Sequence, residues 1–318
     1  MLRGTCFPAF RAGFCPERAV LALAARVQPR QSPRTGRPDG AAGSNQLLYR
    51  YAAPNILMPM PRQSGRLGIQ VHGHRGARAK RPENSIPAFQ YAIEQGADAI
   101  EMDLAVTKDN AVIISHDPIL GPPLCAGPSP QAVIRELTLA EVRQWDCGAA
   151  MPGTRIPTLD EVLQLAGQGD FDYNLEIKSF PEHPEYAPPP DEFAGLVLAA
   201  IRRHSLGRRT IVQSFDFRTL VAMRKQAPEI PLSALTEDDP RDFAAIAQSA
   251  GGTEMVSPHF ALITPEKVKA AHNQGLRIMA WTANTPAAWA ALAHAGVDAI
   301  ITDDPAALIA YLAGQGLR

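Results

Sequence analysis

Hydrophobic and polar positions from about residue 68 onward follow two alternating patterns. Short apolar runs rich in β-branched residues, typical of buried strands, are separated by segments with a helical period. This alternation predicts βα units and a parallel sheet. We interpret the apolar runs as strands at Ile69–Gly73, Ala99–Ala105, Ala111–Ser115, Tyr173–Ile177, Thr210–Gln213, Pro231–Leu235, Glu254–Ser257, Arg277–Trp281 and Ala299–Thr302.

The segments between these runs are amphipathic, and we predict helices there. Several begin with proline, which the first helical turn tolerates because its N–H has no partner inside the helix. The predicted helices are Ile86–Gln95, Thr158–Ala166, Asp191–His204, Phe217–Ala227, Pro240–Ala250, Pro265–Gln274, Pro286–Ala295 and Pro305–Ala313.

The spacing of the second and third strands indicates the fold. Only Val106–Asn110 separates them, whereas a parallel crossover needs about a dozen residues or more, so the two strands must form a hairpin. Without the return strand, Ala111–Ser115, eight strands remain, which is the number in a TIM barrel. We therefore predict an α/β fold, a (β/α)8 TIM barrel with a β-hairpin after strand 2. An open doubly wound sheet is the alternative.

Two segments do not fit the alternation. Residues 118–152 are rich in proline and glycine and predict a short insertion on the active face of the barrel. Residues 1–66 are rich in Arg, Pro, Gly and Ala without a helix or strand period, which predicts a disordered tail, or one that a start at Met58 or Met60 would remove. The catalytic barrel domain is thus expected over residues 67–318.

Composition limits the partners and the compartment. The net charge of −1 and a pI of about 6.7 give no reason to expect a nucleic-acid partner, and the apolar run Ala19–Ala25 is too short to span a membrane. We expect a cytoplasmic protein, with a secreted or periplasmic one as the alternative. Cys125 and Cys147 flank the insertion and could pair in an oxidising compartment. Nothing in the sequence predicts the oligomeric state.

Charged side chains stand where four of the predicted strands end, which is the functional face of such a barrel. Side chains two residues apart on a strand lie on the same face of the sheet, as Glu101 and Asp103 would. The side chains are His74 and Arg75 after the first strand, Glu101 and Asp103 on the second, His116 after the return strand, and Glu176 and Lys178 on the next.

The hairpin gives a geometric reason to place His116 with the carboxylates. A two-residue turn at 109–110 sets His116 opposite Asp103, and a turn at 108–109 sets it opposite Glu101. Directly opposed residues share a face of the sheet, so either register brings the imidazole to the acidic side. A longer, bulged turn would break this rule.

Three carboxylates together in a barrel mouth repel one another unless a cation neutralises them. Ligation by oxygen alone favours Ca²⁺ or Mg²⁺ over zinc, so we expect a divalent cation held by Glu101, Asp103 and Glu176. The two histidines are then free for acid and base work near neutral pH, and Arg75 and Lys178 for binding phosphate oxygens. This set of groups suits phosphodiester cleavage.

The stretch from His72 to Pro118, HGHRGARAKRPENSIPAFQYAIEQGADAIEMDLAVTKDNAVIISHDP, resembles the opening signature of the glycerophosphodiester phosphodiesterase family. Later segments resemble it too: TLAEVRQWDCG, RIPTLDEVL, NLEIKS, WTAN and GVDAIITDDP. The resemblance covers about Ile69 to Leu312. It departs from the family pattern at Ser85, at Asn110 and in a short insertion, and the last leaves the range of substrates open.

The resemblance implies a reaction and roles for these residues. The family cleaves glycerophosphodiesters to glycerol 3-phosphate and an alcohol through a cyclic phosphate, with a bound metal and two histidines. The matching positions are His74 and His116 for acid and base, Glu101, Asp103 and Glu176 for the metal, Arg75 and Lys178 for the phosphate, Glu83 for organising the site, and Trp281 for the substrate pocket. Which histidine is acid and which is base stays open.

Other interpretations remain for function and for single residues. A lysophospholipase D, or a lyase that stops at the cyclic phosphate, would use the same site, and a non-catalytic binding barrel is a third possibility. Trp281 could be plain core and His72 an outer support of the site. Phe215 could line the pocket floor or only pack. Asp303 and Asp304 are interpreted as the end of the last strand and the cap of the final helix.

Overall fold

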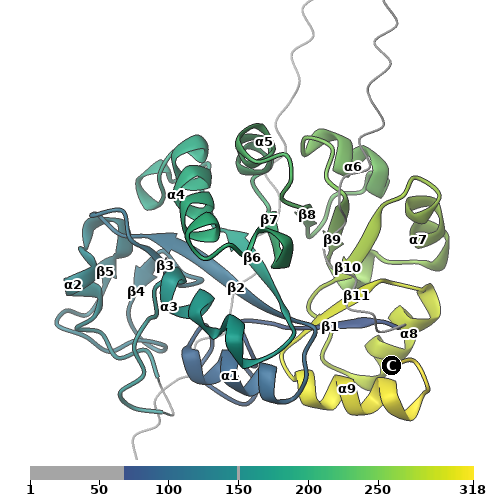
Figure 1. The fold of residues 1–318 in the computed structure, drawn as a ribbon, viewed down its shortest axis with the longest axis horizontal. Coiled ribbons are helices and arrows are strands. Elements are labelled where there is room, and N and C mark those ends of the chain that lie inside the picture. Colours follow the sequence, from purple (N-terminus) through teal and green to yellow (C-terminus); the bar gives the residue numbers. More distant parts are fainter. Residues whose placement is uncertain (1–67, 149–150) are drawn as a thin grey trace, which may run out of the picture. The chain divides into compact units, whose positions relative to one another are not determined.

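A computed structural model describes residues 68–148 and 151–318, which contain a closed parallel β-barrel surrounded by helices (Figure 1). The predictions made for residues 1–66 lie outside this range. The barrel strands are β1 (Gln70–Gly73), β2 (Ala99–Val106), β6 (Asp172–Ile177), β7 (Thr210–Ser214), β8 (Leu232–Thr236), β9 (Met255–Pro258), β10 (Arg277–Ala280) and β11 (Ala299–Thr302). Because β1 pairs with both β2 and β11, the sheet closes, and the predicted TIM barrel is confirmed over the open sheet.

Helices follow the strands along the chain and cover the outside of the barrel (Figure 1). They are α1 (Ile86–Glu94), α3 (Leu159–Leu163), α4 (Pro190–Arg203), α5 (Phe217–Gln226), α6 (Phe243–Ser249), α7 (Pro265–His272), α8 (Pro286–Ala295) and α9 (Pro305–Gly314). Short 3-10 turns are η2 (Gln164–Gln168), η3 (Pro184–Tyr186), η4 (Gly207–Arg209) and η5 (Phe260–Leu262).

Helix starts follow the expected chemistry. Proline stands in the first turn of α7, α8 and α9, and a side-chain oxygen of the preceding residue accepts a backbone N–H in each case. The predicted helix from Pro240 begins later, at Phe243, because Asp242 is its cap and accepts the N–H of Ala245 at 2.7 Å.

The hairpin register differs from both predicted ones. β3 (Val112–Ile114) is antiparallel to β2, and Val106 pairs with Val112. Thr107 donates its backbone N–H to the carbonyl of Ala111 at 3.0 Å, so the loop has three residues, 108–110, and Asn110 takes a left-handed conformation with φ 63°. This longer turn places the return strand one residue away from either two-residue register. The prediction that His116 lies directly opposite Asp103 or Glu101 was therefore wrong. β3 ends at Ile114, before the chain reaches the histidine.

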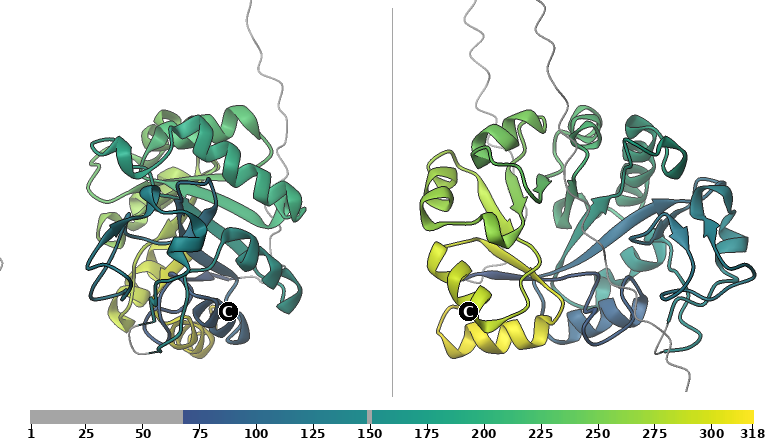
Figure 2. Two further views of the ribbon diagram at one scale, coloured as in Figure 1. Left: turned by 90° about the vertical axis from the view of Figure 1, so that its left-hand side faces the viewer. Right: turned by 180° about the vertical axis from the view of Figure 1, so that it is seen from behind.

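The insertion predicted at 118–152 is a small layer with its own core beside the barrel (Figure 2). It contains β4 (Ile119–Leu120), β5 (Ala132–Val133), η1 (Ile134–Glu136) and α2 (Leu139–Val142). Its apolar cluster includes Leu120, Ile134 and Trp145 and reaches Ala105 at the far end of β2. Cys125 and Cys147 form a disulfide across the insertion, as the sequence allowed.

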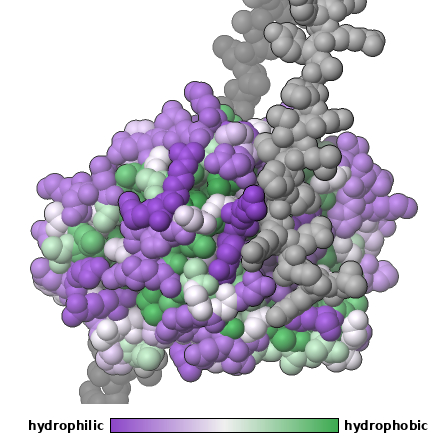
Figure 3. Space-filling model, viewed as in Figure 1, coloured by the Kyte–Doolittle hydropathy of each residue, from purple (hydrophilic) through white to green (hydrophobic). Residues whose placement is uncertain are grey.

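The main core lies between the strands and the surrounding helices, and a smaller cluster of Ile211, Met255, Met279 and Ala299 lies apart from it. Hydrophilic side chains cover much of the face seen in Figure 3, with smaller hydrophobic areas between them. No helix among the described residues is long and apolar enough to cross a membrane.

Candidate active site

Three carboxylates meet where the middle of β2 lies beside the carboxyl end of β6. Glu101 and Asp103 lie on one face of β2, and Glu176 pairs in register with Asp103 on the neighbouring strand. All three are buried, and one ligand oxygen from each lies within 4.8 Å of the others. The structure thus brings together the three side chains that the sequence assigned to a metal.

Burial and mutual repulsion set the charge of these groups. Burial, reinforced by Asp103 and Glu176, raises the pKa of Glu101 well above its ordinary value. Burial also raises the pKa of Glu176 to about 7. Burial would raise the pKa of Asp103 too, but Lys178 and Arg75 hold it below its ordinary value. Two of the three carboxylates therefore take up protons readily when no cation is bound.

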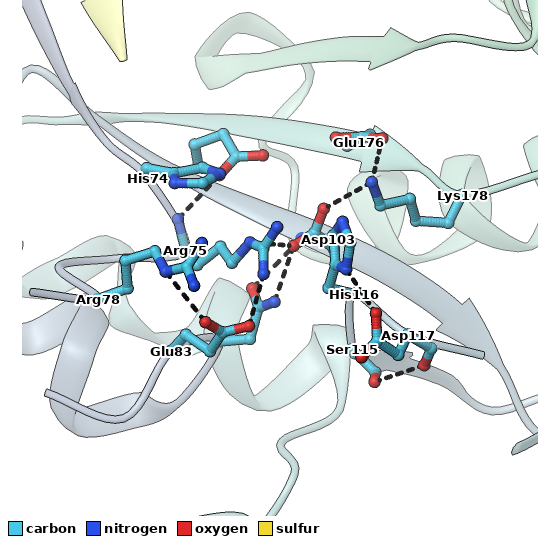
Figure 4. Close-up of polar contacts among 12 residues, drawn as sticks. His74, Arg75, Arg78, Glu83, Asp103, Ser115, His116, Asp117, Glu176 and Lys178 are labelled. Carbon is cyan, nitrogen blue, oxygen red and sulfur yellow. Dashed lines mark hydrogen bonds and ion pairs between the residues drawn. The ribbon is translucent and has the colours of Figure 1, made fainter. Parts of the chain in front are cut away.

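Two cations lie among the carboxylates (Figure 4). Lys178 Nζ lies 2.7 Å from Glu176 Oε1 and 3.3 Å from Asp103 Oδ1. Arg75 lies between Asp103 and Glu83, with its Nε 3.1 Å from Asp103 Oδ2 and one Nη donating to Glu83 Oε1 at 2.6 Å. Burial lowers the pKa of Lys178, but its two acidic neighbours outweigh this effect and raise it above its ordinary value.

The turn after β1 places Arg75 by its backbone as well as by its side chain. Its φ of 49° is left-handed, and its N–H donates to Glu101 Oε2 at 2.8 Å. The next residue must be glycine, because a Cβ on Gly76 would stand 2.6 Å from the backbone carbon of Ala88. Asn84, also left-handed, donates to Asp103 Oδ2 at 2.8 Å and is a support that the sequence analysis missed.

His74 contacts a residue from the other end of the chain. Its Nδ1 lies 2.5 Å from Asp303 Oδ1. Asn284 holds Asp303 in turn, donating to Oδ2 at 2.8 Å and accepting its backbone N–H at 2.8 Å. Asp304 caps α9 as expected, but Asp303 is a partner of His74. The pair of adjacent aspartates before Pro305 is the only feature of the sequence that could have pointed to this role of Asp303.

His116 stands at the opposite side of the carboxylates from His74 (Figure 4). Its side chain is 35% exposed, and its Nδ1 lies 2.7 Å from Asp117 Oδ1. Burial lowers its pKa, an effect that Lys178 and Arg75 reinforce and Asp103 opposes. Although the predicted register was wrong, the bend after β3 still brings His116 to the cavity that holds the carboxylates.

A cavity of about 250 Å³ opens over these groups. Trp281 lines it and is fixed by a 2.8 Å hydrogen bond from its Nε1 to the carbonyl of Ser257, so it is more than core. Phe215 lines it as well, and at 43% exposure lies at the mouth instead of on the floor. His72 is buried beneath the site against Asn174. The full lining is His74, Arg75, Glu101, Asp103, His116, Glu176, Lys178, Gln213, Phe215, Leu235, Glu237, Trp281 and Ile301.

Comparisons with known proteins agree with this geometry. Residues 74–307 match the glycerophosphoryl diester phosphodiesterase family. A glycerophosphodiester phosphodiesterase of Caldanaerobacter subterraneus is 32% identical over 75% of this chain and 96% of its own length. A solved structure of a candidate glycerophosphoryl diester phosphodiesterase from Silicibacter pomeroyi has a TM-score of 0.73 at 32% identity, over 79% of this chain and 95% of the other.

A more distant solved structure shares the fold. It is a phosphodiesterase of Oleispira antarctica in complex with its product sn-glycerol-3-phosphate, with a TM-score of 0.69 at 23% identity, over 77% of this chain and 97% of the other. The family match extends over most of the barrel and includes every strand end that carries a charged group. The chain belongs to the glycerophosphoryl diester phosphodiesterase family.

Proposed function

We propose that the protein hydrolyses glycerophosphodiesters to glycerol 3-phosphate and an alcohol, with a divalent cation and two histidines. One observation supports this most strongly: three buried carboxylates, two fixed cations and two histidines line one cavity. Family membership supports the substrate class, and the side chains that line the cavity support the proposed chemistry. The substrate is a small molecule.

The carboxylates fit a hard divalent cation. All three donors are oxygens, which favours Ca²⁺ or Mg²⁺, and Oε1 of Glu176 is buried without an aligned hydrogen bond. Burial raises the pKa values of Glu101 and Glu176 although Arg75 and Lys178 oppose this shift, so a bound cation would offset part of the cost of keeping both carboxylates charged. When bound, the cation would lower the pKa of a hydroxyl that contacts it.

Arg75 and Lys178 would bind the phosphate oxygens. Both are nearly buried, with side chains 11% and 14% exposed, so their charges are poorly screened by water. Their ion pairs with Glu83 and Glu176 hold them in place before substrate arrives. Removing a group that stabilises charge in a transition state typically costs on the order of 10²–10³ in rate.

His74 and His116 would move the protons. One accepts the proton of the glycerol 2-hydroxyl as its oxygen attacks phosphorus, and the other donates a proton to the departing alcohol oxygen. This step gives a cyclic phosphate, which water opens to glycerol 3-phosphate with the two roles reversed. Each histidine has an acidic partner at Nδ1, Asp303 and Asp117 respectively, which leaves Nε2 for proton transfer.

Glu83 and Trp281 would support the reaction without exchanging protons. Glu83 contacts two arginines, Arg75 at 2.6 Å and Arg78 at 3.1 Å, and so positions the phosphate-binding guanidinium. Trp281 forms a wall of the cavity that its hydrogen bond keeps rigid.

The test uses glycerophosphocholine as substrate. Protein treated with chelator should be inactive and should release glycerol 3-phosphate once Ca²⁺ or Mg²⁺ is added; full activity after complete metal removal would contradict the proposal. His116→Ala should fold and lose turnover, whereas His183→Ala, a control at a 60% exposed histidine, should not. Phosphorus NMR distinguishes glycerol 3-phosphate from a cyclic end product.

The compartment stays a prediction. The sequence favoured the cytoplasm and left an exported protein as the alternative. The Cys125–Cys147 disulfide supports that alternative, because disulfides persist in oxidising compartments and are rare in the cytosol.

A further inference from the structure

The cavity has two chemically different ends. Its inner end carries the cations Arg75 and Lys178 among the carboxylates, and Lys178 Nζ, 5.8 Å from the centroid of the Phe215 ring, marks the border between the two ends. Its outer rim is formed where β7, β8 and β10 end, by Phe215, Glu237 and Trp281. The phosphate binds at the inner end under the proposed function, so the rim faces a substituent of the phosphodiester.

The aromatic part of the rim is exposed yet held in place. Phe215 is 43% exposed, and its ring stands nearly perpendicular to that of Trp281, at 87° with the centroids 5.4 Å apart. His259 packs on Trp281 at 5.3 Å, and the indole donates to Ser257. The two rings therefore present a preformed aromatic surface to whatever enters the cavity that they line.

Glu237 adds an unbalanced negative charge to this rim. It is exposed directly after β8, and it has neither an ion pair nor a hydrogen bond within the part of the chain that the structure describes. Its neighbour Asp239 is paired with Arg241 at 2.5 Å. The carboxylates of the adjacent cavity beyond His116 are also paired, Glu83 with Arg75 and Asp117 with His116 itself.

From these observations we propose that the rim of Phe215, Trp281 and Glu237 binds an alkylammonium group on the leaving alcohol of the substrate. The proposal rests on the proposed function. Glycerol is neutral and the phosphate lies inside, so a positive charge can only belong to the other ester substituent. Aromatic rings attract alkylammonium ions through their negative faces, and a carboxylate nearby adds to that attraction.

The test compares two substrates that differ in headgroup charge. The purified full chain is assayed with glycerophosphocholine and glycerophosphoglycerol at low and high salt. Wild type should favour the choline ester, and Glu237→Gln should lower the ratio of the two kcat/KM values roughly three- to tenfold, mainly at low salt. Phe215→Leu should lower the same ratio. Asp238→Asn, a matched control at the adjacent exposed carboxylate, should keep the wild-type ratio.

Each other outcome contradicts the inference. A Glu237→Gln variant that keeps the wild-type ratio overturns it, and so does one that loses both activities equally. If wild type hydrolyses neither ester, the proposed function fails first. Calorimetry then tests the inference separately. It measures the affinity of each ester for His116→Ala and for the double variant His116→Ala/Glu237→Gln. The same ratio of the two affinities in both proteins would reject the inference.

Discussion

His74 Nδ1 lies 2.5 Å from Asp303 Oδ1, although 229 positions separate the two residues in the chain. Closure of the barrel accounts for this, because β1 and β11 are neighbours and His74 donates its backbone N–H to the carbonyl of Thr302 at 2.8 Å. The carboxylate selects which ring nitrogen faces the cavity, so Asp303 should act on the reaction through His74.

Asp303→Asn should therefore lower kcat roughly 10- to 100-fold, as loss of a supporting carboxylate commonly does. KM should change little, because Asp303 does not line the cavity. Steady-state kinetics with glycerophosphocholine measures this. Asp304→Asn is the matched control, since asparagine also caps helices and should keep the wild-type rate. A wild-type kcat in Asp303→Asn would rule out the positioning role.

Binding of Ca²⁺ or Mg²⁺ should stabilise the fold. A ligand at about 100 times its Kd adds about 2.7 kcal/mol, which should raise Tm by roughly 5–10 °C in a chain of this size. Glu176→Gln should remove most of this shift and raise the Tm of the metal-free protein, because a buried carboxylate with its pKa raised to about 7 is costly to ionise.

Differential scanning fluorimetry with and without chelator checks both effects, with Glu182→Gln as an exposed control. Equal metal-induced shifts in wild type and Glu176→Gln would show that the cation does not depend on this carboxylate.

Reduction of the Cys125–Cys147 disulfide should destabilise the insertion. The bond closes a loop with a sequence separation of 22, for which chain entropy predicts about 3 kcal/mol. Urea unfolding with and without reductant measures it. The single variants Cys125→Ser and Cys147→Ser should be as unstable as the double variant, and additive losses would mean that the sulfurs act separately.

Acid should weaken the fold through His72. This side chain is 1% exposed, and burial lowers its pKa from 6.5 to about 4. Between these two pH values the unfolded chain binds a proton that the folded chain does not, so the free energy of unfolding falls as pH falls. The full loss is on the order of 3 kcal/mol.

His72→Gln should reduce this pH dependence, and urea titrations at pH 7.5, 6 and 5 would reveal it. His183→Gln, at an exposed histidine, serves as the control and should follow wild type. Parallel pH profiles for wild type and His72→Gln would contradict the assignment.

The barrel was predictable because its strands are short apolar runs whose ends carry charge. Burial of β2 on both faces leaves Glu101 and Asp103 as conspicuous exceptions in an apolar segment, so sequence alone could select them. The disulfide was allowed but not required by the sequence.

The remaining features depend on geometry that a sequence does not contain. The hairpin register depends on whether the loop has two residues or three, and the three-residue loop shifts the return strand by one residue. Asp303 looks like any helix-capping acid until barrel closure brings it to His74. Glu237 could not be singled out, because its lack of a partner is a property of the fold.

β2 serves two structures at once. Its first part carries Glu101 and Asp103 inside the barrel, and its last residues pair with β3 and pack into the core of the insertion. An exchange of insertions between relatives should therefore be joined after Asp117 and before Pro157, because a junction within β2 would move the carboxylates and one within the hairpin would replace His116. Variation of the insertion then alters the adjacent cavity beside His116, which Leu120 and Leu124 line, while the acidic cluster keeps its place.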